Sequence, residues 1–294
     1  MKPFSICITS CNRLKYLKAL FESIEDLREY AQVVVVDTGS TEPGLVDFVR
    51  SQNVDFSQLD GERDWINDEY KAKNKLIEMS KHDVVMFLQD DTQIIATKRA
   101  FEQVSDDMEQ MDDCYVLDIF GVRKQTMRNT VDLSPKIING RSYWRRKDRH
   151  YITTGIYKRE VFESIGEYPT SWEQDKANWG KSEDWYNKKF QENFPEGNIY
   201  RTHVPLALAV WNTSGGGYAF IRENKRFGEY LDPEDGSGLY YSKNVQCMEH
   251  ESYSPVSFTE VAEPLGWSLA KDETGEIKKQ NQWEIFENGP FELL

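Results

Sequence analysis

The chain has 294 residues, enough for one large domain or two smaller ones with a substantial core. Its formal charge of −14, from 50 acidic and 36 basic residues, argues against non-specific binding to nucleic acids or anionic membranes, because the molecule as a whole repels polyanions. Aromatic residues make up 13% of the chain, which suits a packed core and also a cleft that stacks planar or sugar rings.

Cysteine usage and hydropathy bear on the compartment. The four cysteines, Cys7, Cys11, Cys114 and Cys247, have neither CxxC spacing nor the density of a disulfide scaffold, which indicates a reducing compartment and argues against zinc. No apolar stretch approaches the roughly 18 residues that span a bilayer, and the N-terminus lacks a signal-peptide pattern. We therefore expect a cytoplasmic protein without a membrane span.

The first 95 residues alternate between apolar runs of strand length and segments of helix length. The runs at 4–9, 33–36 and 84–88 are rich in β-branched and other apolar residues, as expected for strands of a parallel sheet. A helix is expected at about 66–80, and another follows the first run. This alternation predicts a doubly wound α/β half with right-handed crossovers.

Each of these three strands ends in polar residues, at 9–12, 37–40 and 89–92. Asn12 is placed to cap the helix that follows the first strand. Because ligands of such sheets bind outside the carboxyl ends of the strands, the three polar ends should share one crevice.

The third strand runs directly into Asp90 and Asp91. Two adjacent carboxylates repel each other and resist burial, so they need a cation or solvent. Mg²⁺ or Mn²⁺ fits, because it is held by one or two carboxylates while substrate phosphates complete its shell. The alternative is a solvated turn at the end of the strand.

A second acidic pair, Glu183 and Asp184, lies between Trp179 and Trp185 where a helix is expected to begin. One interpretation is that both carboxylates stabilise the positive end of that helix. The other is that the aromatic neighbours partly desolvate a carboxylate and keep it basic enough to accept a proton from a hydroxyl.

The second half mixes strands and helices. We expect a strand at 115–120, a helix near 158–165 and one apolar strand at 200–211. The stretch RSYWRRKDRH at 141–150 concentrates cations in an acidic protein. It is either a solvated loop or a contact for phosphates or an anionic acceptor, to which guanidinium groups bind bidentately.

Five stretches, in order over roughly residues 3–215, resemble family 2 glycosyltransferases of the GT-A fold. They are FSICITSCNR, QVVVVDTGSTE, KAKNKLIEMSKHDVVMFLQDDT, TGIYKREVFESIGEYP and SEDWYNKKF. The resemblance implies an α/β fold with a mixed, mainly parallel sheet flanked by helices. It also implies a domain at 1–218, with a nucleotide-binding half at about 1–95 and an acceptor half at 96–218. The stretch at 219–294 has scattered Gly, Pro and aromatic residues and little periodicity, and we expect it to form a C-terminal appendage packed on that domain.

The resemblance also implies a role for individual residues. Thr38 and Gln89 each stand where the family pattern has an aspartate, so the preference for base and donor sugar is left open. The third metal ligand is also left open, with His203 and His250 as candidates. The implied nucleotide-binding residues are Thr9, Asp37, Lys73, Gln89 and Asp90, the metal ligand is Asp91, the catalytic base is Asp184, and the candidates for acceptor or phosphate contacts are Glu183, Trp185, Arg145 and Arg146.

The implied activity is a metal-dependent, inverting transfer of a sugar from a UDP-linked or other nucleoside-diphosphate donor to a hydroxyl of a glycan or other hydroxylated polymer. Mn²⁺ or Mg²⁺ is the implied cofactor. One alternative is transfer to a modified nucleic acid through the basic stretch, which the net charge disfavours. Another is a sugar nucleotidyltransferase, disfavoured because the first turn, TSCNRLKYLK, lacks glycine. A retaining transferase and a non-catalytic binding domain are the remaining alternatives.

Overall fold

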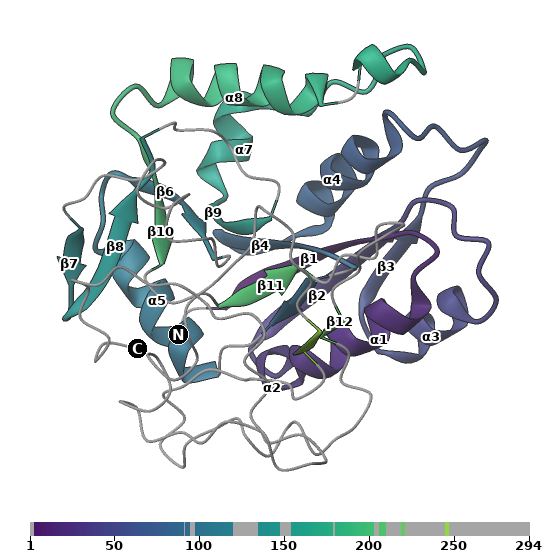
Figure 1. Ribbon diagram of the computed structural model, residues 1–294, viewed down its shortest axis with the longest axis horizontal. Helices are drawn as coiled ribbons and strands as arrows, with labels where there is room; N and C mark the ends of the chain where they lie inside the picture. The colour runs from purple at the N-terminus through teal and green to yellow at the C-terminus, as the bar shows by residue number, and fades with distance from the viewer. Residues whose placement is uncertain are drawn as a thin grey trace.

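A nine-stranded sheet forms the centre of the described part of the chain (Figure 1). The structure is a computed structural model, and it describes residues 3–90, 92–94, 98–119, 135–147, 154–178, 180–202, 206–209, 219–220 and 245–246. The strands of the sheet are β1 (Phe4–Ser10), β2 (Ala31–Asp37), β3 (Asp55–Gln58), β4 (Val84–Gln89), β6 (Cys114–Asp118), β7 (Lys136–Ile138), β8 (Arg141–Arg145), β9 (Gly155–Lys158) and β10 (Asn198–Thr202). They lie in the order β3-β2-β1-β4-β9-β6-β10-β8-β7.

Helices cover both faces of this sheet (Figure 1). One face packs against α1 (Leu14–Ser23), α2 (Glu25–Arg28), α3 (Leu45–Ser51) and α5 (Lys98–Glu109), and the other against α4 (Asp68–Met79), α7 (Glu160–Ile165) and α8 (Lys181–Asn193). Successive strand residues point to opposite faces, so Ile6 and Ile8 join the first core and Cys7 the second. The expected fold class, an α/β fold with a mixed and mainly parallel sheet, is confirmed.

The register of the sheet brings the polar strand ends together. β1 pairs in parallel with β2 and with β4, so that Ser10 lies opposite Asp37 and Thr9 opposite Gln89. β9 is antiparallel to both β4 and β6, and β10 is parallel to β6, so β6 and β10 also end at this edge. The three predicted strands, β1, β2 and β4, therefore end at one edge of the sheet, and the expectation that their polar ends share one crevice stays a prediction.

Two stretches of the second half differ from expectation. The single strand predicted at 200–211 is instead β10 and a separate strand, β11 (Ala207–Ala209), which pairs with β5 (Thr92–Ile94) outside the main sheet. Pro205, which has no N–H to donate, lies between β10 and β11 in the sequence.

The first part of the basic stretch is not a solvated loop but strand β8, joined to β7 by a tight hairpin. The hairpin turn consists of Asn139 and Gly140, with φ of 48° and 81°. Both values suit the two-residue turn whose twist matches a hairpin, and Asn-Gly is its commonest sequence. The Asn-Gly sequence at this turn was therefore a signal for a hairpin that sequence analysis could have used.

The predicted C-terminal extension, 219–294, lies outside the described residues except for β12 (Ala219–Phe220) and β13 (Val245–Gln246), which pair with each other. The division at residue 218 therefore stays a prediction. None of the helices in the described part of the chain has the length and apolar character needed to cross a bilayer.

Candidate functional site

Asp37 ends β2, and its buried carboxylate organises the turn that follows. Oδ1 accepts hydrogen bonds from the backbone N–H groups of Gly39 (3.0 Å) and Ser40 (2.7 Å) and from Nε2 of Gln58 (3.1 Å). Oδ2 accepts one from the Ser40 hydroxyl at 2.5 Å. A carboxylate has about four acceptor positions, so a nucleotide base would have to share oxygens that already hold this turn. The base contact of Asp37 stays a prediction.

The turns after β1 and β2 interlock. Asn12, with φ of 52°, accepts hydrogen bonds through Oδ1 from the backbone N–H groups of Thr41 (2.6 Å) and Glu42 (2.9 Å). In return, the Glu42 carboxylate accepts a bond from the N–H of Leu14 at 2.8 Å, in the first turn of α1. The prediction that Asn12 caps α1 is wrong: its side chain binds the neighbouring turn, and the helix end is satisfied from that turn instead.

A cavity of about 210 Å³ opens beside these two turns. Its lining includes Thr38 and Gly39 from the turn after β2, and Leu59, Gly61 and Arg63 from the segment after β3. Pockets that enclose a drug-sized ligand measure roughly 300–1,000 Å³, so this cavity suits one ring of a larger ligand.

Asp90 follows β4 and is buried. Its Oδ2 accepts a hydrogen bond from the backbone N–H of Cys11 at 2.8 Å, and its Oδ1 lies 3.1 Å from the guanidinium of Arg13. A backbone donor and a cation therefore compensate this carboxylate and tie the end of β4 to the turn after β1. Asp91, the predicted metal ligand, lies outside the described residues.

The carboxylate oxygens at this edge of the sheet are the kind of ligand that hard divalent cations prefer. Within the described ranges, no three His, Cys, Asp or Glu side chains are grouped so that they could hold a metal. Mg²⁺ and Mn²⁺ need no such group when one or two carboxylates act together with substrate phosphates. The hydroxyl of Ser10, beside the same strand ends, is buried without a hydrogen-bond partner among the described residues, which marks a polar position for a water or ligand atom.

A chain of side-chain contacts leads from the end of β4 to the start of α8. Nε2 of Gln89 donates to the Glu69 carboxylate at 3.1 Å, and Nζ of Lys73 lies 2.8 Å from the same carboxylate oxygen. On its other side, Nζ lies 3.9 Å from the Glu183 carboxylate. The Lys73 side chain is only 2% exposed, so its ammonium group is enclosed between α4 and α8.

Two asparagines, Asn67 immediately before α4 and Asn74 within it, hold the connection between α7 and α8. Asn74 binds the backbone of Tyr168 twice, donating to its C=O at 3.0 Å and accepting from its N–H at 2.8 Å. Asn67 binds Trp172 in the same way, at 2.7 and 3.1 Å. The asparagines are seven residues, or about two helical turns, apart and therefore face the same side of α4. They fix the segment that leads into α8.

The acidic pair lies in the first turn of α8. The backbone N–H of Asp184 donates to the C=O of Gly180 at 2.9 Å, and its side chain is exposed. Glu183 is half-buried and faces Lys73, and among the described residues no side chain caps this helix by a hydrogen bond. Trp185 packs partly against the core beneath α8, whereas Trp179 lies outside the described residues.

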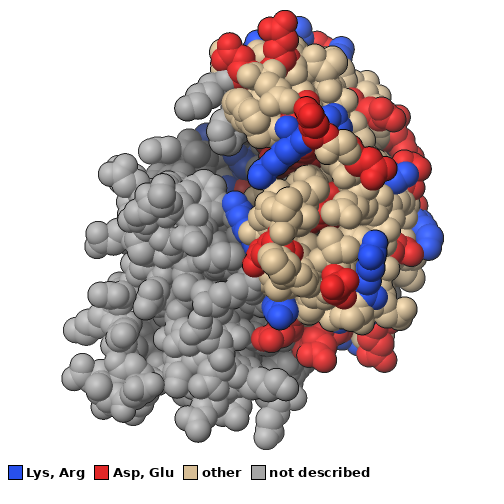
Figure 2. All heavy atoms as spheres, turned by 90° about the vertical axis from the view of Figure 1, so that its right-hand side faces the viewer, with Lys and Arg blue, Asp and Glu red and all other residues tan. Residues whose placement is uncertain are grey.

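The two arginines of the basic stretch point in different directions. Arg145 is exposed on β8, whereas Arg146 is buried, with its guanidinium 3.2 Å from the Asp118 carboxylate. Asp118 also accepts a hydrogen bond from Nε of Arg201 at 2.9 Å. As a phosphate ligand, Arg146 would have to leave this buried pair. Figure 2 shows the side of the molecule on which α3 and β3 lie, away from β8, and in its described part acidic and basic side chains are interspersed.

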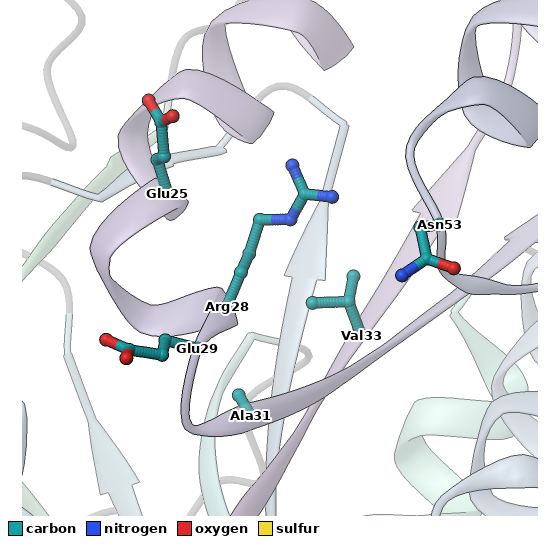
Figure 3. Close-up of a pocket in the computed structure, with 6 residues that line it drawn as sticks. All are labelled: Glu25, Arg28, Glu29, Ala31, Val33 and Asn53. Atoms are coloured by element: carbon teal, nitrogen blue, oxygen red, sulfur yellow. The ribbon is translucent and has the colours of Figure 1, made fainter.

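A second cavity, of about 340 Å³, lies at the opposite edge of the sheet, where β2 begins (Figure 3). Glu25, Arg28 and Glu29 line it from α2 and the residue after it, and Asn53 lines it from the other side. The guanidinium of Arg28 donates to the side chain and the backbone C=O of Gln52, which holds α2 to the end of α3. This cavity lies away from the strand ends at which the predicted residues meet.

The structure thus brings most of the predicted residues to one side of the sheet. Sequence reasoning missed Glu69, Asn67 and Asn74, although the four-residue spacing of Glu69 and Lys73 is a recognisable helical ion-pair pattern. The residues brought to the strand ends are Thr9, Asp37, Gln89 and Asp90, and those at the contact of α4 with α8 are Lys73, Glu183, Asp184 and Trp185.

A family model described as "Glycosyl transferase family 2" matches residues 5–166, more than half of the chain. A search of curated protein sequences found no match.

Among solved structures, the chain resembles residues 1–349 of S. aureus TarS. The complex with UDP-GlcNAc is 19% identical, with a TM-score of 0.52 over 80% of this chain and 63% of that one. The complex with UDP is also 19% identical, with a TM-score of 0.51 over 71% and 60% of the two chains. Glucosyl-3-phosphoglycerate synthase from Mycobacterium tuberculosis, in complex with Mn²⁺ and UDP-glucose, is 11% identical, with a TM-score of 0.49 over 73% of each chain. This chain therefore spans less than two thirds of the TarS chains, and the likeness is one of fold.

Proposed function

The chain belongs to glycosyl transferase family 2, and from this premise we propose that it is a glycosyltransferase that moves a sugar from a UDP-linked donor to an acceptor hydroxyl, with inversion and with the help of a divalent cation. The observation that carries the proposal is the chain of contacts from Gln89 through Glu69 and Lys73 to Glu183. It joins the strand ends, where ligands of such sheets bind, to a pair of carboxylates in the first turn of α8.

The donor fits the strand ends. The cavity between the turns after β1, β2 and β3 has room for a flat ring, and the predicted nucleotide-binding residues Thr9 and Asp37 end the strands beside it. A UDP donor is further supported by the fold that this chain shares with TarS, which was solved with UDP and with UDP-GlcNAc.

We assign the divalent cation to Asp91, next to the buried Asp90. Bound Mg²⁺ or Mn²⁺ would neutralise the charge that develops on the departing diphosphate. The protein's own part at this corner is to keep the end of β4 in place, through the bonds of Asp90 to Cys11 and Arg13.

The transfer itself is a single displacement. Asp184 accepts the proton of the acceptor hydroxyl as that oxygen forms a bond to the anomeric carbon, and the bond from this carbon to the diphosphate oxygen breaks, with its electron pair leaving on the nucleoside diphosphate. Attack from the face opposite the leaving group inverts the anomeric configuration. Asp184 suits the role because its side chain is exposed in the first turn of α8, one residue from the carboxylate that Lys73 holds.

The acceptor that we propose is a glycan or another hydroxylated polymer. A nucleic-acid acceptor is not supported, since Arg146 is buried against Asp118 and the chain carries a formal charge of −14.

The test is a screen of nucleotide sugars with and without Mn²⁺, read by thermal stabilisation, donor hydrolysis and transfer. We expect UDP and one UDP-sugar to raise the melting temperature, more strongly with Mn²⁺. Asp91→Asn should lose the metal-dependent part of the shift, and Asp184→Asn should keep it while losing transfer. Failure of every nucleoside diphosphate to stabilise the protein would refute the donor assignment, and an NMR assignment of the product anomer decides between inversion and retention.

A further inference from the structure

The single positive charge of Lys73 lies close to two carboxylates, those of Glu69 and Glu183. Its ammonium group is 2.8 Å from Glu69 of its own helix and 3.9 Å from Glu183 of α8, and Asp184 follows Glu183. The rings of Tyr70 and Tyr168 complete its surroundings, with their centroids 5.1 and 5.7 Å from Nζ. One buried cation thus stands between two carboxylates from different helices.

The charges at this contact influence one another. The positive charge of Lys73 holds the pKa of Glu69 below its usual value. Burial raises the pKa of Glu183, which Lys73 opposes and the negative charges of Glu69 and Asp184 reinforce. Burial, followed by the charges of Glu183, Glu69 and Asp184, also raises the pKa of Tyr70. The carboxylates of Glu69, Glu183 and Asp184 therefore lie close enough together that removing the charge of Lys73 changes the electrostatic potential at each of them.

Lys73 is poorly placed to be a ligand of the donor. Its side chain is 2% exposed, whereas those of its partners Glu69 and Glu183 are 37% and 29% exposed. A diphosphate approaching from solvent would meet the two carboxylates before it met the ammonium group, and like charges repel. The nucleotide-binding role implied by the family resemblance therefore does not match this geometry.

We propose that Lys73 is a positioning residue, which holds Glu69 and Glu183 together across the contact of α4 with α8 and so keeps the first turn of α8, with Asp184, in place for proton transfer. This proposal rests on the proposed function. The positive charge of Lys73 also offsets part of the negative potential that Glu69 and Glu183 produce at Asp184.

The main test compares Lys73→Met with Lys75→Met in the full-length protein. Lys75 lies on the same helix, and its pair with Glu78 is largely exposed, so its variant is the matched control. In Lys73→Met, the acid limb of the pH profile of kcat should move up by about one pH unit, because an uncompensated carboxylate lies beside Asp184. Affinity for UDP and Mn²⁺, measured by calorimetry, should stay unchanged, and Lys75→Met should match the wild type in both.

The second variant is Glu183→Gln. In it the buried ammonium group of Lys73 keeps Glu69 as a partner. The substitution removes a negative charge beside Asp184, so the acid limb should move down, opposite to Lys73→Met. In the double variant, Lys73→Met with Glu183→Gln, the limb should return toward the wild-type position. A pH profile that moves in neither single variant, or a loss of UDP affinity of about tenfold or more in Lys73→Met, would overturn the proposal and make Lys73 a donor ligand or a purely structural residue.

A stability measurement separates this proposal from the proposed function. Glu69 has a lowered pKa when folded, so the stability that it owes to Lys73 is present above the unfolded pKa and is lost as the pH falls. The melting temperature of Lys73→Met should therefore lie below that of the wild type at pH 7, and the gap should close only as the pH falls below about 4.3, the ordinary pKa of glutamate. If the difference in melting temperature closes in acid but the protein transfers no sugar, the charge coupling between Lys73 and Glu69 is supported and the proposed function is rejected. A gap that stays constant with pH would reject the coupling itself.

Discussion

The strand-end turns and the first turn of α8 are held by different kinds of contact. At the strand ends, carboxylates and amides bind backbone N–H groups of nearby turns, as Asp37 does with Gly39 and Ser40. At α8 and the segment that leads into it, the contacts are made by side chains far away in sequence. Lys73 of α4 faces Glu183, and Asn67, just before α4, binds the backbone of Trp172, 105 residues further along the chain.

This difference indicates how the two regions respond to change. Backbone-bound turns on a parallel sheet are rigid, because the strands beneath them set their separation. The position of α8 depends on a few side-chain contacts between elements. Substitutions at the contacts that hold α8 should therefore reduce sugar transfer without loss of nucleotide binding, whereas substitutions in the strand-end turns should reduce both.

The largest expected effect comes from Asp184→Asn. Because an amide cannot accept the proton of the acceptor hydroxyl, kcat should fall by about 10²- to 10⁴-fold. The affinity for UDP should not change, as measured by calorimetry. Glu192→Gln, at the far end of the same helix, is the control, and equal losses in both variants would contradict the assignment of Asp184 as the base.

Asp107→Asn tests how far the outer strands depend on a single buried carboxylate. Asp107 is fully buried and binds Arg141 through two bonds, of 2.5 and 2.6 Å, and Asn139 at 2.8 Å. Removing its charge leaves the Arg141 guanidinium, on a side chain that is 13% exposed, without its counterion, so we expect a loss of about 3–5 kcal/mol in the free energy of unfolding in urea. Asp106→Asn, one residue earlier and exposed, should behave as the wild type.

Asn74→Leu tests the connection that leads into α8. The variant loses both hydrogen bonds to the backbone of Tyr168, for a cost of about 1–3 kcal/mol of stability. Since this segment leads into α8, kcat should fall more than the affinity for UDP. Asn193→Leu, which loses only an exposed bond within α8, is the comparison. A larger loss of UDP affinity than of kcat would reject the division between the two regions.

The smallest of these effects is a dependence on pH. Burial acts to raise the pKa of Asp113, but hydrogen bonds from Lys136, Tyr200 and Asn198 outweigh it and lower the pKa below its usual value. The stability that this carboxylate supplies is therefore present above the unfolded pKa and lost as the pH falls through the folded one. Asp113→Asn should melt a few degrees below the wild type at pH 7 and show little difference near pH 3. The exposed Asp112 provides the control, as Asp112→Asn, and a gap that persists into acid would contradict the interpretation.

Much of the first half could be predicted from local patterns. The run from Val33 to Val36 is continuous and β-branched and ends at Asp37, a pattern that predicts a buried strand of a parallel sheet with its polar end beside those of its neighbours. The hairpin at Asn139 was missed even though its turn sequence is typical, because the charges around it suggested a loop.

The candidate site divides in the same way. The sequence by itself determined the parallel α/β half and the residues at its strand ends, because periodicity and turn residues act over a few positions of the chain. The tertiary structure alone decided that Asn12 binds the neighbouring turn, that Arg146 is buried against Asp118, and that Lys73 faces Glu183. These contacts join residues far apart in the sequence, and many partners of matching charge were available to each, so only the packing of the helices on the sheet could choose among them.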